Sequence, residues 1–256
     1  MKAIAQGLLV LTGLLLAWQI IVVIGELPPY ILPAPVAVAA SLWNNAGSLL
    51  SHAGVTALEI LVGMLLGTLL GSGTALTLGY SRRARRWLLP MLIASQAIPV
   101  FAIAPLLVLW LGYGLGSKIA MTVLIIYFPV TANFYDGLRH VPPGWLDLAR
   151  VMLPQPQRWA VLRHIALPAA LPALASGLRV AAAVAPIGAV LGEWVGASAG
   201  LGYLMLHANS RMQIDLMFAA LLVLAMLAVG LYFAVDASLK WLLPWHTANP
   251  ETAQND

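Results

Sequence analysis

Residues 55–87 read VTALEILVGMLLGTLLGSGTALTLGYSRRARRW, and this stretch decides the class of fold. It opens with an apolar run to residue 79, and a helix needs roughly 20 such residues to cross a bilayer. Four arginines follow between positions 82 and 86. Because positive charge gathers on the cytoplasmic side of membrane helices, the stretch indicates a helix that crosses the membrane and ends in the cytoplasm.

The composition of the whole chain agrees with a membrane protein. Of its 256 residues, 61% are hydrophobic and 9% are charged, whereas ordinary soluble domains carry about 25% charged residues. We therefore predict an all-α membrane protein whose single transmembrane domain covers residues 1–256. Six segments are apolar and long enough to span the bilayer, at about 7–25, 55–79, 88–111, 117–135, 172–194 and 214–237.

The first apolar segment, 7–25, follows Lys2 and could be the core of a secretory signal. It is longer than such a core, and ELPPY follows it in place of a small-x-small cleavage site. We interpret it as a retained membrane helix. Prolines at 28, 29, 33 and 35 then exclude a continuous helix, and residues 36–50 are expected to form a short helix on the outer face.

Basic residues predict the orientation of the chain. With the N-terminus in the cytoplasm, six spans leave ten lysines and arginines inside and two, Lys118 and Arg211, outside, while Arg179 falls within the fifth span. This bias follows the positive-inside rule and predicts that both termini are cytoplasmic. Contact with anionic lipid explains the basic charge, so no nucleic-acid partner is expected. The ten are Lys2, Arg82, Arg83, Arg85, Arg86, Arg139, Arg150, Arg158, Arg163 and Lys240.

A row of glycines marks the second span as a packing helix. Gly63, Gly67 and Gly71 recur at every fourth residue and therefore share one face. Small residues at this spacing allow a second helix to approach closely. Glu59 lies one turn earlier on the same face. We favour an acid at the outer interface that reaches water, with a place in a polar pathway as the alternative.

Two spans contain features of a transport pathway. The third has Pro90, Pro99 and Pro105, with Gln96 between them. Prolines remove helical hydrogen bonds, and membrane helices tolerate this where a neighbour or a cavity satisfies the freed carbonyls. Gln96 and Pro99, with Asn133 near the inner end of the fourth span, are therefore pathway candidates. Simple packing of a helix bundle explains the prolines nearly as well.

Glu193 ends the fifth span just before the glycine-rich stretch GASAG, which begins at Gly196 and ends at residue 200. The acid is either an interfacial residue beside Trp194 or part of an outer gate that includes Gly196. GASAG also matches the nucleophile elbow of hydrolases, but that motif needs a strand–turn–helix setting. We therefore prefer a glycine-rich turn at the membrane edge.

Other chemistry is mostly excluded by the sequence. The chain has no cysteine, which removes catalytic thiols and thiolate metal sites, and no metal site is predicted. All five histidines lie outside the predicted spans, which argues against axial haem ligands. The chain also lacks a P-loop to hold the phosphates of ATP.

Residues 136–171 form the longest internal cytoplasmic loop of this prediction. Within it, QRWAVLRHIAL at 157–167 has the pattern of a short amphipathic helix between Pro156 and Pro168, and another short helix is expected at Pro143–Met152. The apolar side carries Trp159, Leu162, Ile165 and Ala166, flanked by Arg158 and Arg163. The residues favour two interpretations equally: a rigid docking element for a soluble partner, or an interfacial helix on lipid headgroups.

This loop and several other stretches of the sequence resemble a known family. The loop resembles the EAA loop of ATP-binding-cassette (ABC) importer permeases, which opens with Glu-Ala-Ala and closes with Leu-Pro. Asp147-Leu148-Ala149 takes the first place and Leu167-Pro168 the last, while Leu153 replaces the family's glycine and is followed by PQP. LPPYILPAPVAVAASLW, GYSRRARRWLLPML and GEWVGASAGLGYLM are similar to permeases of the nitrate, sulfonate and taurine type. FPVTANFYDGL is most like permeases assigned to hydroxymethylpyrimidine, a thiamine precursor.

The resemblance implies a type I ABC importer permease fold with cytoplasmic coupling helices, in a bacterial inner membrane. It implies no enzymatic activity and no cofactor in this chain, since a separate cytoplasmic ABC ATPase would bind and hydrolyse ATP. An extracytoplasmic substrate-binding protein and a second copy of the permease are the other implied partners. The solute would be small and polar, at best a hydroxymethylpyrimidine-type precursor and otherwise a sulfonate, taurine or nitrate. The implied ATPase-coupling residues are Asp147, Ala149, Arg150, Leu153, Arg158, Trp159, Arg163, Leu167 and Pro168.

A stand-alone secondary transporter or channel is the alternative from another class. It would need ion-coupling acids or helix breaks deep in the bundle. Glu59 and Glu193 lie near the ends of their predicted spans, which favours the importer.

Overall fold

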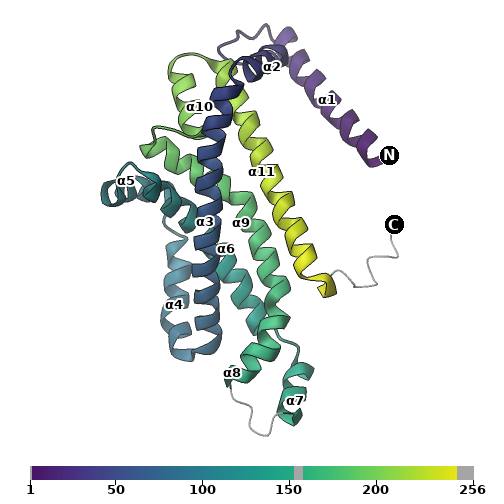
Figure 1. Cartoon of the computed structure of the whole chain (residues 1–256), viewed down its shortest axis with the longest axis vertical. Helices are drawn as coiled ribbons and strands as arrows, with labels where there is room; N and C mark the ends of the chain where they lie inside the picture. The colour runs from purple at the N-terminus through teal and green to yellow at the C-terminus, as the bar shows by residue number, and fades with distance from the viewer. Residues whose placement is uncertain (1, 153–157, 247–256) are drawn as a thin grey trace. The chain divides into compact units, whose positions relative to one another are not determined.

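The computed structural model describes residues 2–152 and 158–246. Every regular element within those ranges is a helix, so the prediction of an all-α chain is confirmed (Figure 1). The chain folds as two compact units, Met1–Ala57 with Ala197–Leu227 and Leu58–Gly196 with Ala228–Asp256. Helix α3, Ala46–Tyr80, contributes residues to both units.

The first unit contains α1 (Lys2–Ile24), α2 (Pro35–Asn44), the start of α3, α10 (Leu201–Ser210) and the first part of α11 (Ile214–Leu242). Pro35 lies in the first turn of α2, where a missing N–H breaks no helical bond. The expected helix over 36–50 is wrong at its end. The side-chain amide of Asn45 donates to the Ser41 carbonyl at 3.0 Å and caps α2, so residues from Ala46 onward belong to α3. The core consists of Val38, Leu49, Leu201, Leu204, Ala219 and Ala220.

The second unit contains the remainder of α3 and the end of α11, together with the helices between them in sequence up to Gly196. The longest of these, α6 and α9, pack against each other over much of their length. The elements are α4 (Arg82–Ser95), α5 (Val100–Leu111), α6 (Leu115–Arg139), α7 (Pro143–Met152), α8 (Arg158–Val161), a π-helical turn (Leu162–Ala166), α9 (Leu167–Gly196) and a 3₁₀ turn (Pro244–His246).

Helix α6 packs between α3 and α9, and glycines on both neighbours allow the close approach. A Cβ added to Gly67 of α3 would lie 2.5 Å from Ile126 Cγ1, and one added to Gly188 of α9 would lie 2.7 Å from Thr122 Cα. Separations this short do not occur for real Cβ atoms. Gly63 and Gly71 face α6 in the same way as Gly67. The glycine row of the second span therefore lies against the fourth span.

The third predicted span, 88–111, is not a single helix. Helices α4 and α5 meet at a bend of 101°, because Pro99 is extended and has no N–H with which to continue α4. Helix α4 also starts earlier than predicted. The Ser81 hydroxyl accepts a hydrogen bond from Ala84 N at 3.2 Å, so the arginine run forms the first turns of α4.

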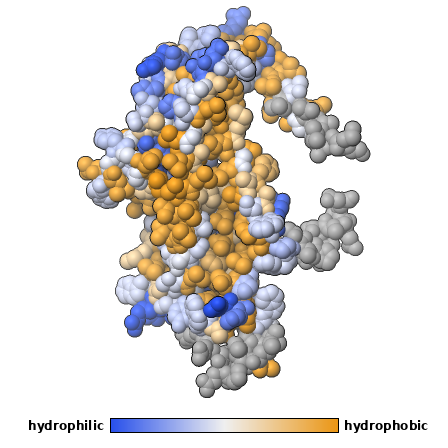
Figure 2. Space-filling model, in the orientation of Figure 1, coloured by the Kyte–Doolittle hydropathy of each residue, from blue (hydrophilic) through white to orange (hydrophobic). Residues whose placement is uncertain are grey.

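The described residues contain four helices that are long and apolar enough to cross a membrane, and the bent pair α4–α5 would make a fifth. The apolar part of α1, Thr12–Ile24, is shorter, so the count of six remains a prediction. The face in Figure 2 is largely apolar, as lipid-facing helices require, because the bilayer offers no water to solvate polar groups. Exposed apolar side chains include Leu65, Leu69, Leu109, Trp110, Met226 and Phe233.

Candidate functional site

The predicted cytoplasmic loop forms α7, α8 and a π-helical turn that leads directly into α9. Leu167 N–H donates to the Leu162 carbonyl, five residues earlier, and the helical path continues from Trp159 to Gly196 over 38 residues. The expectation that Pro168 ends a separate helix is therefore wrong. Pro168 lies in the first turn of α9, and the π-turn shifts the hydrogen bonding by one residue, which accommodates the missing N–H.

The amphipathic pattern of this path divides its side chains between the core and the surface. Leu162 and Ile165 pack with buried Ala166 against the core that includes Phe134 and Leu138. Trp159, expected on the same apolar side, is instead 59% exposed. Its ring meets the Tyr80 ring edge-on, with centroids 6.3 Å apart. The indole is thus a large apolar group at the surface, while its neighbours anchor the segment.

The other predicted coupling residues lie on both sides of residues 153–157, which the structure does not describe. Asp147, in α7, is exposed, as are Arg163 and Pro168, while Leu167 is half-buried. Ala149 and Arg150 lie in α7 and Arg158 begins α8, but their side chains are outside the described part. Leu153 also lies outside the described residues.

The pathway candidates lie in different helices. Gln96 caps the end of α4 and its side-chain amide donates to Ser95 Oγ at 3.2 Å, while Pro99 precedes α5, so both mark the bend. Asn133 of α6 donates to the Pro129 carbonyl at 2.8 Å. A Cβ at Gly177 of α9 would lie 3.0 Å from the Asn133 Cβ. The amide of Asn133 is therefore bonded within its own helix, at a close contact with α9.

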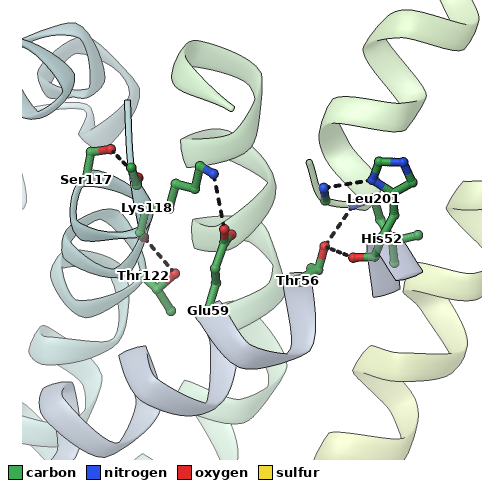
Figure 3. A network of polar contacts seen from close by, with 9 residues as sticks. His52, Thr56, Glu59, Ser117, Lys118, Thr122 and Leu201 are labelled. Atoms are coloured by element: carbon green, nitrogen blue, oxygen red, sulfur yellow. Dashed lines mark hydrogen bonds and ion pairs between the residues drawn. The ribbon is translucent and has the colours of Figure 1, made fainter. Parts of the chain in front are cut away.

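Three ionisable side chains meet inside the second unit. Glu59 of α3 is 0% exposed, Lys118 of α6 is 4% exposed and Glu193 of α9 is 1% exposed. Lys118 Nζ lies 3.4 Å from Glu59 Oε1 (Figure 3), and Glu193 is within electrostatic and hydrogen-bonding reach of Glu59. The favoured interpretation of Glu59 as an acid that reaches water is wrong, because the helix face that carries it packs inward.

This buried cluster, Glu59–Lys118–Glu193, connects three helices. Any group of the cluster that is ionised has given up hydration, which costs several kcal/mol per ion unless a partner replaces it. Around it are buried hydroxyls, among them Thr122, which donates to the Lys118 carbonyl at 3.1 Å. Lys118 is the residue that sequence reasoning missed, since it was counted only as an outer charge at the start of the fourth predicted span. Its one signal was a lone lysine on the side of the membrane that carries few positive charges.

In the first unit, two side chains of α3 hold the start of α10. Thr56 Oγ1 accepts from Leu201 N at 2.8 Å and His52 Nδ1 accepts from Gly200 N at 3.0 Å (Figure 3). Gly200 has φ +116°, a conformation that favours glycine. Because Gly200 has no side chain, α3 supplies the cap that the turn lacks. GASAG therefore runs from the last residue of α9 to the residue before α10, which is not the strand–turn–helix setting of a nucleophile elbow.

Within the described residues, four helices are long and apolar enough to cross a membrane, which defines the class as a multi-span membrane protein. The chain belongs to the family of binding-protein-dependent transport system inner membrane components, whose model matches residues 63–246. The resemblance to ABC importer permeases is therefore confirmed, and the chain is a multi-pass inner membrane component and not an enzyme. Family membership also removes the alternative of a stand-alone secondary transporter or channel.

Several curated relatives match almost the full chain. It is 59% identical over 238 residues to a Haemophilus influenzae protein named "Probable ABC transporter permease protein", covering 93% of this chain and 95% of that one. It is 36% identical to the formylaminopyrimidine transport permease protein ThiX of Halalkalibacterium halodurans, covering 91% and 92%. It is 38% identical to the riboflavin transport system permease protein RibX of Chloroflexus aurantiacus, covering 95% and 91%.

A solved structure supports the fold. The inward-facing MetNI methionine ABC transporter contains a chain that superposes with a TM-score of 0.57 at 20% identity, covering 81% of this chain and 97% of that one. The similarity supports the type I importer permease fold that the sequence resemblance implied.

Proposed function

We propose that this permease imports a pyrimidine-type nitrogen heterocycle, with a hydroxymethylpyrimidine-type thiamine precursor as the first candidate. The observation that carries the proposal is the near full-length similarity to a permease named for formylaminopyrimidine. Riboflavin is the second candidate, because the riboflavin permease is equally similar and the flavin ring system contains a fused pyrimidine ring. Sulfonates, taurine and nitrate remain the alternatives from the wider group.

The family description and the ABC transporter names of the relatives support two partners for transport. A binding protein outside the cell delivers the solute, and a cytoplasmic ABC ATPase supplies the energy. We place a second copy of this chain across a two-fold axis, since closed two-fold pairing is the commonest arrangement of identical subunits. Both termini face the cytoplasm, as the basic residues predict. Single cysteines introduced at Ser81 and Asn44 should label from the inside and the outside respectively.

Energy coupling is assigned to α7, α8 and the π-turn. When the ATPases close, they move the docked segment, and Trp159 is its exposed anchor. Because the helical path continues from Trp159 to Gly196, displacement of the segment is passed on to α9 through the continuous backbone. Glu193 and Gly196 lie at the far end of that element, so the gate candidates follow the movement. Gln96, Pro99 and Asn133 are proposed to line the pathway. The permease itself makes no covalent bonds.

Uptake by the reconstituted complex tests the proposed solute. The permease, its ATPase and its binding protein are placed in proteoliposomes, and accumulation of labelled hydroxymethylpyrimidine, riboflavin and taurine is measured with and without ATP. The proposal expects ATP-dependent uptake of the pyrimidine. Uptake of riboflavin alone would select the second candidate, and uptake of taurine alone would contradict the proposed solute class.

A further inference from the structure

A cavity of about 380 Å³ opens at the end of α3, beside the segment assigned to energy coupling. Its volume falls in the range of about 300–1,000 Å³ that is usual for small-molecule sites. One wall comes from the end of α3 and the first turns of α4, and the other from α6, α8 and the π-turn. The lining residues are Gly79, Tyr80, Arg82, Arg85, Leu138, Val161, Leu162 and Ala166.

The charge of this cavity is purely positive. Arg82 and Arg85 both line it, and no acidic residue is among the lining side chains. The neighbouring arginines of the same run, Arg83 and Arg86, are not part of the lining. A helical turn thus directs one pair of arginines to the cavity and leaves the other pair outside it. The opposite wall of leucine, valine and alanine side chains is apolar, so the cavity fits a ligand with an anionic group and an apolar part.

Helix α4 places this cavity at the edge of the apolar surface. Trp87 directly follows the arginine run and Met91 lies about one turn further on; they are 66% and 63% exposed. Helix α3 is a candidate membrane span that ends at Tyr80. Under the proposed orientation, which this inference adopts, the arginines lie in the cytoplasmic leaflet. Anionic headgroups are concentrated at that leaflet, and a phosphate accepts paired hydrogen bonds from guanidinium groups.

We infer that this cavity binds the phosphate of an anionic phospholipid of the cytoplasmic leaflet. Arg82 and Arg85 hold the phosphate, and the apolar wall receives the glycerol and the first part of the acyl chains. The lipid then contacts Val161, Leu162 and Ala166 directly. Since Tyr80 lines the cavity and also meets Trp159 edge-on, the occupant braces the segment that carries the proposed ATPase anchor.

The arginine run supplies a matched pair of variants for the test. R82Q/R85Q and R83Q/R86Q remove the same charge from the same helical turns, but only the first pair lines the cavity. The full chain is purified in detergent, and retained phosphatidylglycerol is counted by native mass spectrometry. Its melting temperature is measured with phosphatidylglycerol or phosphatidylcholine added. At about fivefold for each arginine near an anionic surface, R82Q/R85Q should bind phosphatidylglycerol about 30-fold more weakly, while R83Q/R86Q should retain it like the unmodified chain.

A second variant keeps the test decisive if R82Q/R85Q does not fold. Val161→Trp fills the cavity and leaves all four arginines in place, so it should also lose the retained lipid. Unchanged retention in Val161→Trp, or equal loss in the two arginine pairs, would overturn the inference in favour of general surface charge. Inorganic phosphate or glycerol 3-phosphate that stabilises the lipid-free chain as well as phosphatidylglycerol does would show that the ligand is a soluble anion.

The ATPase is the remaining candidate partner for the two arginines. If R82Q/R85Q weakens ATPase association in phosphatidylcholine nanodiscs while lipid retention in detergent is unchanged, the arginines bind the ATPase and the lipid site is refuted. The lipid measurements do not involve solute uptake. Failure of the proposed solute class would therefore leave them unaffected.

Discussion

Replacing Lys118 by methionine tests whether the buried cluster stabilises the bundle. The substitution keeps much of the side-chain volume and removes the positive charge that lies 3.4 Å from Glu59 Oε1. At that distance the attraction is about 5 kcal/mol for an effective dielectric constant of about 20. Glu59 is fully buried, so it cannot regain the lost interaction from water. Leaving one charge of a buried pair alone costs about 3–5 kcal/mol.

The loss should be visible as a lower melting temperature. For a chain of this size, about 2–4 °C per kcal/mol converts a loss of about 3–5 kcal/mol into a fall of about 6–20 °C. The assay is thermal unfolding of the purified permease in nanodiscs. Adding E59Q, in K118M/E59Q, should recover part of the loss, because it removes one of the two acids that K118M leaves in the cluster and with it the repulsion between Glu59 and Glu193.

A second lysine of the chain provides the control. Lys240 Nζ lies only 2.7 Å from Asp236 Oδ2, yet its side chain is 59% exposed. Exposed ion pairs contribute about 0–1 kcal/mol, so K240M should melt close to the unmodified protein despite the shorter distance. The reasoning is refuted if K118M and K240M melt alike, or if E59Q added to K118M lowers the melting temperature further.

Three further predictions concern packing, coupling and the capped turn. Gly67→Leu should lower the folded yield far more than Leu66→Ile, because a Cβ at position 67 would lie 2.5 Å from an α6 side chain. Equal yields of the two variants on size-exclusion chromatography would contradict the contact. Trp159→Ala should weaken ATPase association by about 2 kcal/mol or more, which is the usual loss when an aromatic side chain buried at an interface is removed. Arg163→Ala should have a smaller effect in the same pull-down titration, and full association of Trp159→Ala would remove its proposed role. Thr56→Val should destabilise the chain by about 1 kcal/mol, the usual contribution of a helix cap. The hydroxyl of Thr77 is exposed and bonds to a carbonyl of its own helix, so Thr77→Val should have the melting temperature of the unmodified protein.

Local patterns were sufficient to predict the helical class and the face of one span. The glycine spacing of 63, 67 and 71 predicted a close helix contact, because residues four apart share a face whatever the partner is. The amphipathic pattern of 157–167 likewise indicated a helix, and Leu162 and Ile165 do face the core. Family motifs predicted the permease class, since separated stretches in a fixed order seldom agree by chance.

Tertiary structure decided which residues meet across the chain. Nothing in the local sequence pairs Glu59 with Lys118 or brings Glu193 beside them, because helical periodicity defines a face without naming the helix that covers it. The same limit applies to Thr56 and Leu201, which are 145 residues apart. Proline effects also depended on context. Pro99 separates α4 from α5. Pro168, in contrast, lies in the first turn of α9 without a break, because the π-turn before it rearranges the backbone hydrogen bonds.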